Sequence, residues 1–155
     1  MPAMQLSPSF SLEQLTYSET AEKGGIDNTP PPEMIENLKQ LARGLEALQA
    51  LLGAPLEISS GYRCAALNEA VGGSSASQHM QGLAADIACP GFGPPLALAR
   101  AIQQSGVGFD QCILEYGQWV HLSFSDTPRQ RLLTIYDDKE GYLAGLWDEG
   151  GNQVA

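Results

Sequence analysis

The stretch SQHMQGLAAD, residues 77–86, decides the fold of this chain. It opens as a polar loop and runs into LAADIAC (83–89), a short apolar segment that is typical of a buried β-strand. His79 lies in the loop, and Asp86 lies seven residues later in the strand. Gly82 and the alanines that follow it are small, so the backbone can fold closely around an ion. We therefore expect His79 and Asp86 to share one site.

Two further apolar runs, FDQCILEY (109–116) and WVHLSF (119–124), predict a β-hairpin around a glycine-containing connection. The second run carries His121, one of two histidines in the chain. Two imidazoles and one carboxylate form a three-ligand zinc set that leaves the fourth position for water, as in catalytic sites. Such a site lowers the pKa of the water to about 7. The predicted metal ligands are therefore His79, Asp86 and His121.

A hydrolytic zinc site also needs a base that takes the proton of the water, and Glu115 at the end of the first hairpin strand is the candidate. A three-residue or bulged connection places Glu115 opposite His121 on the same face of the sheet. A two-residue turn at Gly117 and Gln118 instead pairs Leu114 with His121. Both registers remain open, and an exposed hairpin residue is the alternative interpretation of Glu115. The side chain of Gln118 has no titratable group.

Two residues near the predicted ligands are candidate substrate contacts. Arg63 follows LEISS (56–60), which predicts a strand, and is one of eight basic residues. Its guanidinium can hold a carboxylate through two parallel hydrogen bonds, although it can also anchor its own turn. Ser77 can add a hydroxyl hydrogen bond to the same carboxylate. Serines in such positions also act as local caps, so both interpretations of Ser77 remain open.

The remaining pattern predicts an α+β fold. Apolar residues recur at steps of three and four over 33–52 and again over 96–105, which indicates two amphipathic helices. We expect a small, mainly antiparallel sheet with the zinc on one face and helices packed on the other. The whole chain, 1–155, is expected to form a single domain. Within it, residues 1–33 should form an arm packed on the domain.

Shorter elements are expected between and beyond these helices. A short polar helix is predicted near 11–15, followed by a glycine- and proline-rich irregular stretch. A second short helix is predicted over 64–73, where paired glycines end it. RQRLLTIYD (129–137) favours one more strand, and the last residues, 151–155, are expected to fray.

Composition limits the partners of the chain. It has 18 acidic and 8 basic residues, a net charge of -10 and a pI near 4.4. Such a surface repels phosphate backbones and anionic lipids, so we expect neither nucleic acid nor a membrane as a partner. We also expect the protein to be a monomer. Three cysteines without a CxxC pair argue against a disulfide framework. The N-terminal residues lack the pattern of a secretory signal, which predicts a cytoplasmic protein as synthesised. It would then reach the cell wall by phage-assisted release.

The three motifs closely resemble those of the M15 zinc peptidases, the D-Ala-D-Ala carboxypeptidase and dipeptidase family that also includes phage L-alanyl-D-glutamate endolysins. The resemblance lies in SGYR (60–63) and in residues 77–86, which fit the family pattern SxHxxGxAxD. It continues in Trp119-Val120-His121, after a strand carrying Glu115. The order of these motifs is specific, and the N-terminal arm resembles a phage-related, single-domain branch.

This resemblance implies one zinc ion on His79, Asp86 and His121, with a general base on the segment before the last histidine. It also implies that Arg63 binds substrate. The implied activity is hydrolysis of peptidoglycan stem peptides that contain D-amino acids, in a fold like that of Hedgehog proteins and D-Ala-D-Ala peptidases. Whether cleavage is of the carboxypeptidase, dipeptidase or endopeptidase kind stays open, as does the choice between a host enzyme and a prophage lysin.

One position departs from the family pattern. Several members carry the acidic base three residues before the last histidine, where this chain has Gln118, whereas Glu115 lies six residues before His121. Either a longer connection brings Glu115 into the same place, or the base is missing. Two alternatives therefore remain. One is a zinc-binding but catalytically weak or inactive phage structural or wall-binding module, and the other is a metal-free interaction domain.

Overall fold

The structure is a computed structural model that describes residues 4–155. The first three residues of the predicted N-terminal arm therefore lie outside the described part. The helices of the described part are α1 (Leu12–Thr16), α2 (Glu19–Gly24), α3 (Met34–Leu52), α4 (Ala65–Ala70), the 3-10 helix η1 (Gln78–Gln81) and α5 (Pro95–Gln104). Its strands are β1 (Glu57–Ser60), β2 (Ala84–Ala88), β3 (Gln111–Glu115), β4 (Trp119–Ser123), β5 (Arg131–Ile135) and β6 (Leu143–Ala144).

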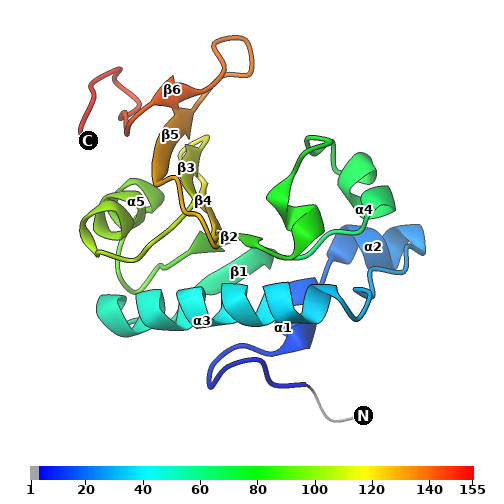
Figure 1. Cartoon of the computed structure of the whole chain (residues 1–155). Helices are drawn as coiled ribbons and strands as arrows, with labels where there is room; N and C mark the ends of the chain where they lie inside the picture. The colour runs from blue at the N-terminus through cyan, green and yellow to red at the C-terminus, as the bar shows by residue number, and fades with distance from the viewer. Residues whose placement is uncertain (1–3) are drawn as a thin grey trace.

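The strands form one six-stranded sheet in the order β1-β2-β4-β3-β5-β6 (Figure 1). All neighbouring pairs are antiparallel except β3 and β5, which run parallel. The predicted α+β fold with a mainly antiparallel sheet is thus confirmed, and the strand expected near 129–137 is β5. The hairpin strands β3 and β4 lie in the middle of the sheet, so most of their backbone groups are paired on both sides.

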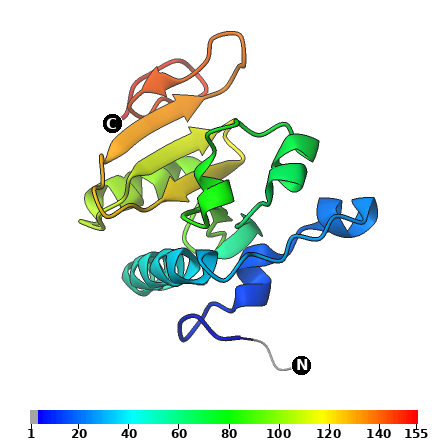
Figure 2. The same cartoon turned by 45° about the vertical axis from the view of Figure 1, so that its right-hand side comes forward.

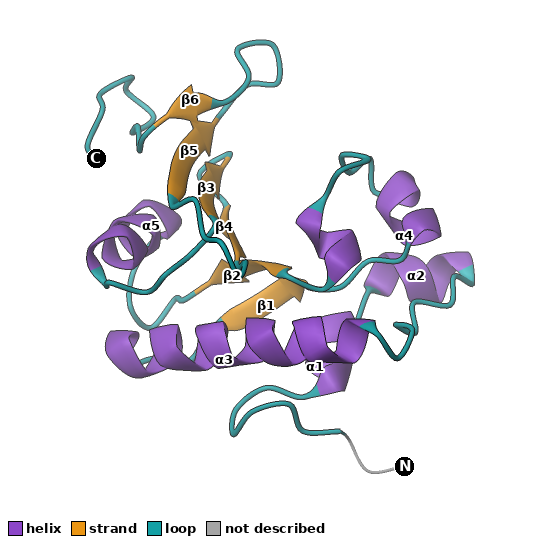
Figure 3. Ribbon diagram, viewed as in Figure 1, coloured by secondary structure: helices purple, strands orange, loops and turns teal. Residues whose placement is uncertain are grey.

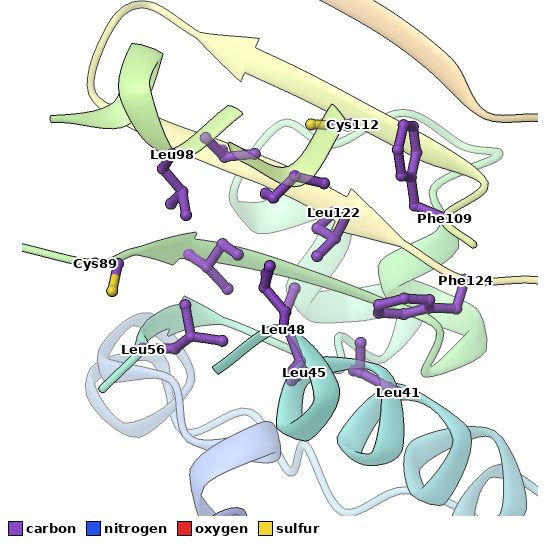
Figure 4. Packing of buried hydrophobic residues seen from close by; sticks show 14 of the residues in the cluster. Leu41, Leu45, Leu48, Leu56, Cys89, Leu98, Phe109, Cys112, Leu122 and Phe124 are labelled. Carbon is purple, nitrogen blue, oxygen red and sulfur yellow. The ribbon is translucent and has the colours of Figure 1, made fainter. Parts of the chain in front are cut away.

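Helices α3 and α5 cover one face of the sheet, whereas α4 and η1 lie on the other (Figures 1 and 2). The covered face is apolar because alternate strand residues point to it. The inward stripe of α3 meets these residues, as the three-and-four spacing predicted (Figure 4). The fully buried side chains of this core include Leu41, Leu45, Leu48, Ile87, Leu98, Leu114 and Leu122. The other face is left free for polar residues.

The hairpin register decides where Glu115 lies. The connection is three residues long, and Glu115 pairs with Trp119 while Ile113 pairs with His121. Tyr116 and Gly117 both have positive φ, 56° and 64°, and the N–H of Gln118 donates to the carbonyl of Glu115 over 3.0 Å. The expectation that a three-residue connection puts Glu115 directly opposite His121 is therefore wrong by two residues. Because strand residues alternate, Glu115 still shares the face of His121.

The N-terminal segment is more regular than the sequence suggested. Ser11 and Gln14 form a capping box at the start of α1, where a short helix was expected. The sequence pattern missed α2, which begins after the Ser18 cap and has only one buried residue, Ala21, so it shows no apolar period. Phe10 and Leu15 are buried in the main hydrophobic cluster.

The C-terminal residues do not fray as expected. Beyond β6 the chain turns back toward its C-terminus (Figure 3). Within this segment Trp147 and Gln153 form an isolated antiparallel bridge. The N–H of Leu146 donates to the carbonyl of Ala155 over 2.9 Å, and Leu146 itself is fully buried. This packing was not visible in the sequence because the segment is short and rich in glycine.

The three cysteines are free thiols, and Cys89 and Cys112 are buried. Among residues 4–155, no helix has both the length and the apolar character needed to cross a membrane.

Candidate metal centre

Three side chains from distant parts of the chain converge on the free face of the sheet. His79 comes from η1, Asp86 from β2 and His121 from β4, and one ligand atom of each lies within 4.8 Å of the other two. Asp86 and His121 are direct partners across β2 and β4. All three residues are buried. They are the three residues that the sequence predicted as metal ligands, and they lie close enough together to share one ion.

The spacing of the donor atoms fits a zinc ion. Asp86 Oδ1 lies 3.2 Å from His79 Nε2 and 3.3 Å from His121 Nδ1. Tetrahedral zinc with bonds of about 2.0–2.1 Å separates its ligand atoms by about 3.3–3.4 Å. Two nitrogens and one carboxylate oxygen are also a donor set that zinc prefers in catalytic sites. The three residues can therefore hold zinc without rearrangement of the strands.

Local structure fixes the ring of His79. Its Nδ1–H donates to the carbonyl oxygen of Gly61 over 2.7 Å, and its Nε2 faces Asp86 Oδ1 at 3.2 Å, where a protonated ring donates to the carboxylate and a neutral ring would offer its lone pair to a metal ion. A carbonyl that orients a ligating histidine in this way is a usual feature of metal sites. The Oγ of Ser77 caps η1 by accepting from the N–H of His79 over 3.2 Å. Gly82 ends η1 with φ of 72° and leads the chain into β2.

Asp86 is held as a carboxylate. Burial by itself raises its pKa, but hydrogen bonds with His121 and His79 outweigh burial and hold the pKa of Asp86 well below its usual range. Arg63 adds a further contact, with Nη2 3.4 Å from Asp86 Oδ2. An ionised carboxylate is the form that binds a metal ion.

Glu115 lines the same cleft as the three ligands. Burial, followed by the charge of Asp86, raises the pKa of this partly buried carboxyl. A bound divalent cation would act in the opposite direction, because its charge favours the ionised form. The indole Nε1 of Trp119, the cross-strand neighbour of Glu115, is buried without a hydrogen-bond partner among residues 4–155. By contrast, Gln118 is exposed in the turn and is not among the residues that line the cleft.

Arg63 also lines the cleft, but its guanidinium is largely engaged. Its Nε donates to Ser60 Oγ over 3.1 Å and its Nη1 to Asn68 Oδ1 over 3.2 Å, in addition to the Asp86 contact. An arginine has five N–H donors, so two remain for a substrate. Both interpretations of Arg63 thus have a structural basis, since it anchors the segment and still faces the cleft. Ser77 likewise acts as a local cap while lining the cleft.

The cleft has a volume of about 720 Å³ and runs over the free face of the sheet. One wall is the loop between α4 and η1, and Tyr142 beside β6 forms the other side. Glu115 lies toward the end where β3 finishes, whereas Arg129 and Arg131 lie toward the end where β5 begins. The cleft is therefore acidic at one end and basic at the other.

The structure adds a hydrogen-bond network around buried Asp110 that the sequence did not predict. Asp110 accepts from Arg129 Nε over 2.9 Å and Nη2 over 2.7 Å, and from Gln78 Nε2 over 2.8 Å. The pKa of Asp110 is lowered to about 2, and the hydrogen bond from the Arg129 side chain is the largest cause. Because Gln78 directly precedes His79, this network supports the loop that carries this candidate ligand. No motif marked it, since its members are common residues that only tertiary packing brings together.

Comparison with known proteins agrees with this geometry. A family model described as Peptidase M15 matches residues 8–123. The match covers the three candidate ligands as well as Arg63, Ser77 and Glu115, and it ends before β5. The comparison with curated proteins gives no match.

Proposed function

Because the chain belongs to the peptidase M15 family, we propose that it is a zinc metallopeptidase that cleaves peptidoglycan stem peptides containing D-amino acids. The observation that carries this proposal is the convergence of His79, Asp86 and His121, with donor spacing suited to zinc, in the cleft that Glu115 also lines. The D-Ala-D-Ala carboxypeptidase type is the specific activity that we propose.

Each residue has a definite part in this reaction. A zinc ion held by His79, Asp86 and His121 would supply a Lewis acid and would lower the pKa of a water molecule bound to it to about 7. Glu115 accepts the proton of the attacking water and returns it to the nitrogen of the leaving amine, so that proton count is conserved. His79, Asp86 and His121 keep the donor set in place, and Gly61 keeps His79 in the required orientation.

Arg63 and Ser77 are the proposed substrate contacts. The two N–H bonds of Arg63 that protein atoms leave free can bind the terminal carboxylate of a peptide, which gives an exopeptidase its end selectivity. The Ser77 hydroxyl accepts from the His79 N–H, and its own hydrogen is available to the same carboxylate. This arrangement favours cleavage near a free C-terminus.

Incubation of zinc-loaded protein with purified muropeptides, followed by mass analysis, tests the proposal. We expect loss of a terminal D-alanine with the wild type, and none with His121→Ala or Glu115→Gln. Identical fragments from all three proteins would contradict the mechanism. Stoichiometric zinc without any product would instead favour the inactive wall-binding module.

A further inference from the structure

Three basic residues of this acidic chain line the cleft. Of its eight basic residues, Arg63, Arg129 and Arg131 line the same cavity as the candidate metal ligands. The chain as a whole carries a net charge of -10. Cationic side chains in a concave site concentrate field lines and attract anions. The basic end of the cleft is thus suited to a negatively charged group, although the acidic surface of the chain is not.

The three arginines differ in whether their guanidinium group already pairs with a carboxylate. Arg63 contacts the carboxylate of Asp86 at 3.4 Å, and Arg129 contacts Asp110 at 2.7 Å. Within residues 4–155, Arg131 forms neither an ion pair nor a side-chain hydrogen bond, and it is exposed. Its backbone N–H donates to the carbonyl of Asp110 over 2.9 Å, which fixes the start of β5 at the mouth of the cleft. Arg131 therefore offers a complete guanidinium fork to a ligand.

The register of the sheet locates this fork relative to the metal ligands. His121 pairs with Ile113, Ile113 pairs with Leu133, and Arg131 lies two residues before Leu133 on the same face. With strands about 4.8 Å apart and a rise of about 3.3 Å per residue, the Cα atoms of His121 and Arg131 are about 12 Å apart. An extended peptide covers this distance in about three to four residues.

We propose that Arg131 forms an anion subsite that binds a free carboxylate within the peptide substrate, about three residues from the bond that is cut. This inference rests on the proposed peptidase function and assigns it a preference for acidic peptides. Arg129 contributes positive charge beside the subsite while its fork stays on Asp110. Arg63 serves a separate group, the terminal carboxylate near the ligands.

Two synthetic peptides that differ by one charge test the subsite. They are L-Ala-γ-D-Glu-L-Lys-D-Ala-D-Ala and the same peptide with the glutamyl carboxylate converted to an amide. We expect the wild type to favour the acid over the amide by about tenfold in kcat/KM, the effect of one charge-assisted pair. In Arg131→Gln this ratio should fall to about one. Arg100→Gln, an equal loss of charge on the helix-covered side of the sheet, should keep the wild-type ratio.

Calorimetric binding of both intact peptides to Glu115→Gln, with and without Arg131→Gln, separates the subsite from the reaction. Tighter binding of the acid that depends on Arg131 supports the subsite even if the wild type cleaves neither peptide, a result that would reject only the proposed function. Cleavage of both peptides with equal efficiency, or an acid preference that survives Arg131→Gln, would overturn the subsite and leave the peptidase intact. Unchanged thermal unfolding of Arg131→Gln shows that the variant is folded.

Discussion

Asp86 and His121 are direct cross-strand partners, and their ligand atoms lie 3.3 Å apart. The candidate metal centre therefore depends on the register of β2 and β4, which the core residues on the opposite face determine. A shift by one residue would turn Asp86 toward the helices and Ile87 toward the cleft. The sheet thus places two ligands, and the η1 loop has to supply only the third, His79.

Zinc should stabilise the wild type because the ion binds the folded chain and not the unfolded chain. At a free zinc concentration about 100 times the Kd, the expected gain is about 2.7 kcal/mol, which appears as a higher Tm. His121→Ala should lose this gain and its stoichiometric zinc. Lys139→Ala, a change in an exposed loop, is the control and should respond like the wild type. A zinc response retained by His121→Ala would place the ion elsewhere.

Glu115→Gln should lower kcat by about 10²–10⁴, the usual contribution of a general base, while bound zinc stays stoichiometric. The amide keeps the size of the side chain but cannot accept the proton. Gln118→Ala should retain the activity of the wild type, because Gln118 is exposed and outside the cleft lining. Steady-state kinetics with metal analysis of each protein measure both effects. If Gln118→Ala were inactive and Glu115→Gln active, the residue that the reaction needs would lie in the turn and not at Glu115.

Much of this site could be predicted from the sequence. His79 and Asp86 stand in one motif of fixed spacing and His121 in a second, and the amphipathic period of α3 is long enough to recognise. Local patterns do not contain the strand order, so the pairing of β2 with β4 and the parallel pairing of β5 were not predictable. The hairpin register depended on Tyr116 adopting positive φ, which is uncommon for a residue with a Cβ. The Asp110 network could not be predicted either, because its residues 78, 110 and 129 come together only in the folded chain.

Acid should weaken the fold through Asp110. Its pKa is lowered to about 2, first by the hydrogen bond from Arg129, so the unfolded chain binds its proton at a higher pH than the folded chain. The stabilisation is therefore complete above about pH 4 and is lost as the pH falls toward 2. Its size is about 1–2 kcal/mol, because half-exposed Arg129 is partly screened by water.

Urea unfolding of the wild type and Asp110→Asn between pH 2 and pH 6 measures this contribution. The variant should be less stable at pH 6 and should differ less from the wild type at pH 2. Asp126→Asn, at an exposed carboxylate, is the matched control and should follow the wild type throughout. A constant difference between the wild type and Asp110→Asn at all pH values would show that the carboxylate does not titrate with folding.

Gly44 in the middle of α3 lies against the ring of Phe124. A Cβ at this position would come within 2.3 Å of the ring. Alanine favours a helix over glycine by about 1 kcal/mol, but overpacking a core costs about 1–3 kcal/mol. We expect overpacking to prevail, so Gly44→Ala should lower the free energy of unfolding by about 1–2 kcal/mol. Phe124→Leu makes room, and in that background Gly44→Ala should be neutral or stabilising. Destabilisation of equal size in both backgrounds would exclude the ring as the cause.

Gly61→Ala should damage the fold and the metal centre together. A Cβ on Gly61 would lie 2.2 Å from the carbonyl oxygen of Leu15, which also accepts from the N–H of Tyr62 over 2.7 Å. This neighbour is backbone and cannot rotate away, so the segment has to shift. The carbonyl of Gly61 shifts with it and no longer holds His79 Nδ1 at 2.7 Å.

We therefore expect Gly61→Ala to lose about 1–3 kcal/mol of stability and to bind zinc about 10–100-fold more weakly, as when an outer partner of a ligating histidine is lost. Gly24→Ala is the matched control, because a Cβ there meets only the Ile26 side chain at 3.6 Å, an ordinary contact. Chemical unfolding and competition with a zinc chelator measure the two effects separately. Weaker folding with unchanged zinc affinity would mean that the Gly61 carbonyl does not orient His79, and that the glycine serves only the packing of α1 against the sheet.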